Sequence, residues 1–177
     1  LRDEVAGAEW PTQVEIFTSD NNTSWKSAGA FSVKGAATTE SIIYNFQEKV
    51  SATGRYVKFV VTPGSKDVIL IDEVRVLKTS NIPDPGEQEP SKPVDLSNDL
   101  AYGKSYTYSR EPNSGYPDTG SKELTDGKHA PGKQFTTEAE WVGFLALPDG
   151  EREDVAVTLD LGQTETFEGV SIEYGLD

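Results

Sequence analysis

The sequence contains no cysteine and a single histidine, His129. The absence of cysteine excludes a disulfide scaffold, a thiolate zinc site and a cysteine nucleophile. With one histidine, we expect no histidine-based metal cluster, and the spacing of the residues indicates no Ser–His–Asp catalytic arrangement. We therefore expect His129 to be an exposed loop residue.

Long apolar runs are also absent, since no run approaches the roughly 18 residues that a membrane-spanning helix needs. No signal peptide and no initiator Met is found, and we interpret the chain as a piece of a longer protein. Positive charge is scarce: 16 Lys and Arg oppose 30 Asp and Glu, for a formal net charge of −14. This charge would repel nucleic acids and anionic membranes. We expect no nucleic-acid partner and no membrane insertion, and the charge serves either solubility or the recruitment of cations such as Ca²⁺.

Alternating apolar residues dominate what is present, and they predict strands. The pattern is found in the segments 13–17, 55–62, 154–162 and 167–175. Each segment has one apolar and one polar face, which is typical of antiparallel sheets packed as a sandwich. The segment 41–46 is apolar on both faces and indicates a central strand. The nearest approach to a helical pattern lies at 136–146, where we expect at most one short turn.

A segment rich in proline and acidic residues, 81–98, lies in the middle of the chain. It has four prolines, four acids and no aromatic residue, the composition of a solvated, semi-rigid linker. We expect 82–96 to be exposed and to make few contacts. The arms on either side, 1–80 and 99–177, do not resemble each other.

The two arms resemble different parts of one family. The first arm carries VEIFTSDNNTSW (14–25), GRYVKFVV (54–61) and IDEVRV (71–76). It is similar to the second half of a discoidin-type domain, the coagulation-factor type C or galactose-binding-like β-sandwich. The second arm is similar to the first half of such a domain and carries LAYGKSYTYS (100–109), LTDG (124–127), Trp141, TLDLG (158–162) and VSIEYG (170–175). YPDTG and LTDG resemble a bacterial subset found in secreted multidomain proteins, often in tandem.

The resemblance implies an all-β fold, a discoidin-like jelly-roll β-sandwich. Residues 1–80 would be the C-terminal half of one module, 81–98 the linker and 99–177 the N-terminal half of the next. Together the arms supply about one full strand set, so they can pair as a circularly permuted sandwich. The alternative is two half-modules with open sheet edges. We expect pairing, with contacts between residues before 80 and after 150 and with Glu73 near Asp126.

The family resemblance also implies a structural Ca²⁺ ion. Glu73 and Asp126 match its side-chain ligands, and nearby backbone carbonyls would complete the oxygen shell. The alternative is that Glu73 is a surface acid and Asp126 a turn former before Gly127. Strand alternation with Val74 turns Asp72 inward and Glu73 outward, unless a bulge intervenes.

Carbohydrate-binding modules need an aromatic platform for a sugar ring and a few polar groups for its hydroxyls. The loop aromatics are Trp25, Tyr102, Tyr106, Tyr108, Tyr116, Phe135, Trp141 and Phe144. We select Tyr116, within NSGYPDTG, as the best ligand-binding candidate and Trp141 as the next. For each of these rings, packing in the core is the alternative.

The function implied by the resemblance is non-catalytic binding of a glycan or polysaccharide. The module would belong to a secreted or cell-wall-associated extracellular protein, beside neighbouring modules of the parent chain. No nucleophile, paired acids or metal triad indicates an enzyme. Two alternatives stay open: a structural spacer in a surface array, and an adhesion module that binds protein ligands.

Overall fold

The computed structural model describes residues 11–33, 42–64, 68–79, 86–87, 96–131, 135, 138–145 and 153–176. These residues are all-β, as the alternation predicts. The strands are β1 (Gln13–Ser19), β2 (Lys26–Ser32), β3 (Ile42–Thr62), β4 (Val68–Leu77), β5 (Gly86–Glu87), β6 (Ser105–Tyr108), β7 (Val142–Leu145) and β8 (Val155–Leu176). Two single-turn 3-10 helices, η1 (Leu96–Asn98) and η2 (Glu123–Thr125), complete the elements. No helix in this described part is long and apolar enough to cross a membrane.

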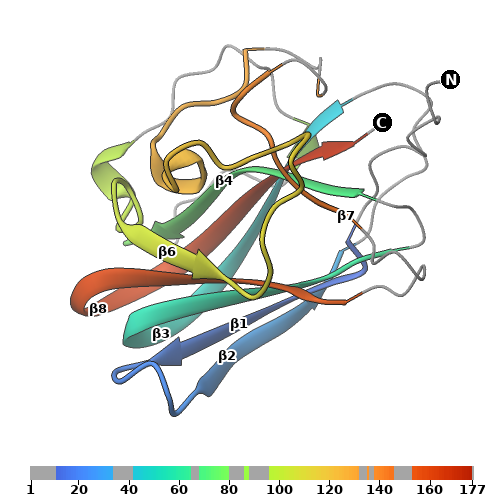
Figure 1. Cartoon of the computed structure of the whole chain (residues 1–177). Coiled ribbons are helices and arrows are strands. Elements are labelled where there is room, and N and C mark those ends of the chain that lie inside the picture. Colours follow the sequence, from blue (N-terminus) through green and yellow to red (C-terminus); the bar gives the residue numbers. More distant parts are fainter. Residues whose placement is uncertain are drawn as a thin grey trace, which may run out of the picture.

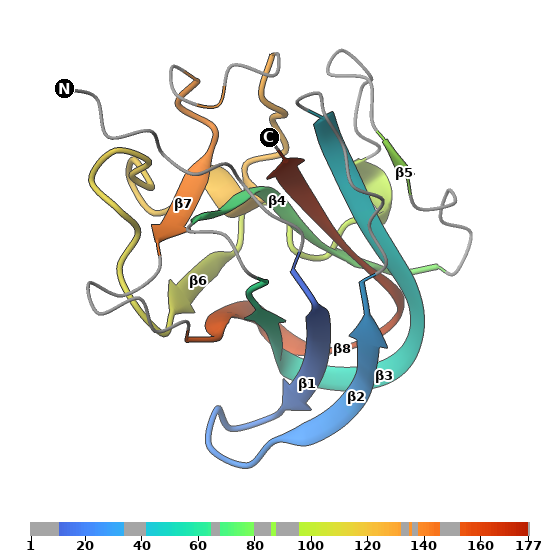
Figure 2. The ribbon, with the colours of Figure 1, turned by 90° about the vertical axis from the view of Figure 1, so that its right-hand side faces the viewer.

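The strands form one antiparallel sheet with the order β2-β1-β3-β8-β4-β7, while β6 pairs with β8 and β5 with β3 (Figure 1). The long strands β3 and β8 pair almost from end to end, from Ile42 opposite Leu176 to Val61 opposite Val155. The register shifts near the middle, between Lys49 and Ala52. Figure 2 shows β3 curving strongly along its length, so the sheet folds back on itself. This arrangement fits a β-sandwich, because one bent sheet supplies two facing layers.

The core lies between the two layers and draws on both arms. Its members include Val14, Ile16, Val57, Phe59, Val61, Val74, Val76, Val155, Val157, Leu159, Phe167, Val170 and Ile172. The inward-facing residues of β3 and β8 in this set are at most 1% exposed. Full burial of each large apolar side chain is worth about 1.5–3 kcal/mol. The expected contacts between residues before 80 and after 150 are therefore confirmed.

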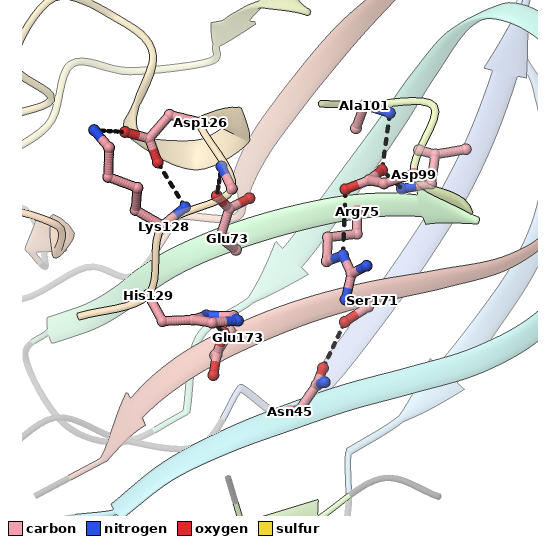
Figure 3. A network of polar contacts seen from close by, with 12 residues as sticks. Asn45, Glu73, Arg75, Asp99, Ala101, Asp126, Lys128, His129, Ser171 and Glu173 are labelled. Atoms are coloured by element: carbon pink, nitrogen blue, oxygen red, sulfur yellow. Dashed lines mark hydrogen bonds and ion pairs between the residues drawn. The ribbon is translucent and has the colours of Figure 1, made fainter. Parts of the chain in front are cut away.

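The start of the second arm is tied to β4 by a buried acid, Asp99. Its Oδ1 accepts hydrogen bonds from the backbone N–H of Val76 and Ala101, at 3.2 and 2.9 Å. Its Oδ2 accepts one from Arg75 Nε at 3.2 Å (Figure 3). Burial raises the pKa of Asp99, and the bonds from Ala101, Arg75 and Val76 act in the opposite direction.

Little of the predicted linker falls within the described residues. Gly86 and Glu87 form β5 and pair with Asn45 and Tyr44 of β3, and 96–98 form η1. The expected exposure of the other residues in 82–96 lies outside the described part. The division into two half-modules stays a prediction.

Opening the chain within 88–95 should leave the two arms associated, because β3 and β8 hold them together along nearly their whole lengths. A protease site inserted there and then cleaved should give one particle by size-exclusion chromatography under native conditions and two fragments in urea. Separation of the arms without denaturant would contradict the pairing.

Candidate functional site

Trp141 is a core residue and not an exposed platform. It is 1% exposed, and its ring meets that of Phe135 edge-on, with centroids 4.9 Å apart. Its Nε1 donates to Glu138 Oε2 at 3.2 Å. Gly175 of β8 makes room for this packing, since a Cβ there would lie 3.0 Å from Trp141 Cζ3. The ligand-binding role expected for Trp141 is not supported, because a buried ring offers no face to a sugar.

Tyr116 is half-buried and joined to β7. Its carbonyl accepts the N–H of Gly143 at 3.0 Å, and the Gly143 carbonyl accepts the N–H of Asn113 at 2.8 Å. A Cβ on Gly143 would lie 2.6 Å from Tyr116 Cβ. Tyr116 also packs against the smaller core cluster that contains Trp141. A role for Tyr116 in ligand binding stays a prediction. Because the residue is half-buried, less of it is free for a ligand than the expected exposed position would offer.

The exposed aromatic residue is Tyr102, at 49%, the one large hydrophobic side chain classed as exposed within the described part of the chain. It precedes Gly103, whose φ of +67° forms a turn that suits glycine. The Gly103 N–H donates to the Thr125 carbonyl at 2.7 Å, which holds this turn against η2. The Tyr102 ring lies against Gly127, where a Cβ would be 3.0 Å from Tyr102 Cε2. The sequence analysis included Tyr102 among the loop aromatics but did not choose it as a ligand-binding candidate. Gly103, which indicates a tight turn directly after Tyr102, was the signal that could have led to that choice.

Glu73 and Asp126 come close to each other, as expected, but their carboxylates have different partners. Glu73 Oε1 accepts a hydrogen bond from the backbone N–H of Gly127. The Asp126 carboxylate accepts from Lys128, at 2.9 Å from the backbone N–H and 2.8 Å from Nζ (Figure 3). Asp126 thus acts as the turn former of the alternative interpretation. Binding of Ca²⁺ by Glu73 and Asp126 stays a prediction.

The exception allowed for Glu73, a bulge in the strand, is present in the structure. The pairing of β4 with β8 shifts register between Ile71 and Val74, a bulge that breaks the alternation of faces. Asp72 and Glu73 are in consequence both buried, at 0% and 2% exposure. Strand alternation alone would have left Glu73 in solvent.

His129 is likewise not an exposed loop residue, because its side chain is only 19% exposed. It lies over the sheet beside Glu173 of β8 (Figure 3), and it also approaches Asp72 of β4. Its Nδ1 is 3.5 Å from Asp72 Oδ2 and in direct contact with Glu173 Oε2. The backbone N–H of Ala130 donates to Asp72 Oδ2 at 3.0 Å. These contacts bring His129, Asp72 and Glu173 into one cluster, termed here the acid–histidine cluster.

Burial dominates the electrostatics of these acids. It raises the pKa of Asp72 to about 7. Burial, helped by the charge of Asp72, raises the pKa of Glu73 to about 9. Burial acts to lower the pKa of His129, but the contacts with Asp72 and Glu173 outweigh it and raise that pKa to about 10. The imidazole is therefore cationic at neutral pH and compensates for part of the buried negative charge.

No protein-family model, no curated protein and no solved structure matches the chain. The fold and the sites together define an antiparallel all-β protein with an exposed tyrosine beside η2 and a buried acid–histidine cluster.

Proposed function

We propose that the chain is a non-catalytic module that binds an extracellular glycan or polysaccharide, with Tyr102 as the platform for a sugar ring. The observation that carries this proposal is the isolated exposure of Tyr102, at 49%. Proteins bury most of their large aromatic surface, and an exposed tyrosine can stack on the apolar face of a pyranose. The resemblance of both arms to discoidin-type domains supports the same class of ligand.

Two polar residues on the loop that follows η2 are the sequence neighbours of the glycine on which this ring packs. Gly127, against which Tyr102 packs, is flanked by Asp126 and Lys128. The Lys128 side chain is 72% exposed and the Asp126 side chain 24%. A carboxylate acceptor and an ammonium donor beside an aromatic face are the groups that orient sugar hydroxyls. We propose that Asp126 and Lys128 supply these hydrogen bonds.

Replacing Tyr102 with alanine should weaken glycan affinity about tenfold or more, which corresponds to about 1.4 kcal/mol. A glycan array identifies ligands of the native chain, and calorimetry then compares the variants. Tyr102→Phe is the matched control and should keep most of the affinity, because it retains the ring. Asp126→Asn and Lys128→Ala should weaken binding by smaller factors.

Two outcomes would contradict the proposal. Equal affinity of the native chain and Tyr102→Ala would place the binding site elsewhere. A native chain that binds no glycan would favour the structural spacer, and binding of a protein ligand instead would favour the adhesion module. Because Tyr102 is exposed, its replacement should change the free energy of unfolding by no more than about 0.5 kcal/mol, so a loss of affinity would not report a loss of fold.

A further inference from the structure

The acid–histidine cluster brings three side chains of the metal-ligating type together from separate parts of the chain. Asp72 lies on β4, Glu173 on β8 and His129 on the loop after η2. One ligand atom from each side chain lies within 4.8 Å of those from the other two. We propose that Asp72, His129 and Glu173 bind a divalent transition-metal ion of the Zn²⁺ type, which fastens the 126–131 loop to the sheet.

The spacing suits a single ion. Ligand atoms about 2.0–2.1 Å from a tetrahedral zinc ion are separated from each other by about 3.3 Å. The distance of 3.5 Å between His129 Nδ1 and Asp72 Oδ2 is close to that separation. The contact between His129 Nδ1 and Glu173 Oε2 is shorter. To admit the ion, this contact must lengthen by a small side-chain rotation, and Nδ1 must release its proton to solvent.

An unpaired polar atom within the cluster is an independent observation. Asp72 is 0% exposed, yet its Oδ1 has no hydrogen-bond partner. Buried polar atoms without partners are rare and costly, and one explanation for them is a bound ion. An ion bound by both carboxylate oxygens of Asp72 would satisfy Oδ1.

The kind of donor atom selects the kind of ion. One imidazole nitrogen and two carboxylate oxygens suit zinc and related transition metals, whereas Ca²⁺ prefers a shell of six to eight oxygens. Asp72 and Glu173 expose 0% and 5% of their side chains and His129 exposes 19%. This near-complete enclosure favours a structural ion, since little of the site faces solvent.

The single histidine permits a direct test on the full, tag-free chain. His129 is the only histidine in the sequence, so the imidazole nitrogen resonances in an NMR spectrum report this side chain alone. After treatment with a chelator, addition of one equivalent of Zn²⁺ should shift these resonances and raise the melting temperature. Co²⁺ should give the visible absorption of a nitrogen- and oxygen-ligated ion, and Ca²⁺ should leave the imidazole resonances unmoved.

Variants then assign the ligands. His129→Asn should weaken Zn²⁺ affinity about tenfold or more in competition with a chromophoric chelator. Asp154→Asn is the matched control: Asp154 is an exposed acid near the start of β8, and its loss should leave Zn²⁺ affinity unchanged. Equal weakening by both variants would show diffuse acidic chelation and overturn the proposal.

Three further results would overturn the site. The first is an imidazole signal that Zn²⁺ leaves unmoved, which would make the cluster a plain buried ion-pair network. The second is stabilisation by Ca²⁺ but not by Zn²⁺, which would favour the predicted site at Glu73 and Asp126. The third is undiminished Zn²⁺ affinity in His129→Asn. If His129→Asn does not fold, the response of the native chain's imidazole resonances to added Zn²⁺ decides whether the site binds the ion. None of these readouts depends on glycan binding, so this proposal and the proposed function can fail separately.

Discussion

Replacing Trp141 with alanine is expected to lower the free energy of unfolding by about 3–5 kcal/mol. The indole is 1% exposed and packs edge-on against Phe135. Its removal would leave a cavity over Gly175, which lies beneath both rings. Urea denaturation followed by far-UV circular dichroism measures the change, because it does not depend on the fluorescence of the deleted residue.

The exposed Tyr102 provides the contrast for this prediction. Tyr102→Ala should leave the urea midpoint almost unchanged and impair glycan binding. Trp141→Ala should lower the urea midpoint, while the molecules that remain folded should keep their glycan affinity. If Trp141→Ala kept full stability and lost glycan affinity, the indole would be the platform indicated by the sequence, and its burial here would be wrong.

Replacing Phe59 with alanine is expected to cost a similar amount, about 3–5 kcal/mol, because it removes a fully buried ring at the junction of the two arms. Phe59 of β3 is directly opposite Val157 of β8, and the two are 0% and 1% exposed. The variants Phe59→Ala and Val157→Ala should therefore not be additive. A double-mutant cycle should give an interaction energy of about 0.5–3 kcal/mol.

A second cycle controls for general loss of stability. Phe59 and Trp141 belong to different core clusters, so their substitutions should add within about 0.3–0.5 kcal/mol. Additive behaviour of Phe59 with Val157 would show that the two arms do not share one core. The pairing of β3 with β8 would then be wrong, and with it the single two-layered sheet.

The strand content and the facing of the core residues could be predicted from the sequence. Val57, Phe59 and Val61 alternate with polar neighbours, and all three are fully buried. The lengths of the strands could not be predicted in this way. The segments 154–162 and 167–175 read as two strands, but they are parts of one strand, β8. Pairing with β3 extends to Thr166 and Glu165 and resumes at Asp160 after a register shift opposite Gly54 and Tyr56, so an irregularity interrupts the ladder without ending the strand.

The candidate sites were less predictable than the fold. A single histidine forms no metal-binding motif that could be recognised in the sequence. His129 nevertheless contacts Asp72 and Glu173, which lie more than 40 positions away on either side. The expected closeness of Glu73 to Asp126 is found, since Glu73 accepts the N–H of Gly127 in the loop after η2. The contact of Asp126 with Lys128 could not be predicted in this way, because it depends on a local turn that the Asp126 side chain itself forms.

The sequence by itself determined that this chain is all-β, strongly acidic and without cysteine, because alternation and composition are local properties that no fold can alter. The tertiary structure alone decided that Glu73 and Glu173 are buried. Both read as strand acids on a polar face, and they leave solvent because β4 bulges against β8 and because the 126–131 loop packs over them. It also decided that Trp141 is buried and Tyr102 exposed, since Gly175 gives the indole a place to pack while Tyr102 stands on a loop beside Gly127. Burial depends on what segments far apart in the sequence place over a residue, and a local pattern carries no record of them.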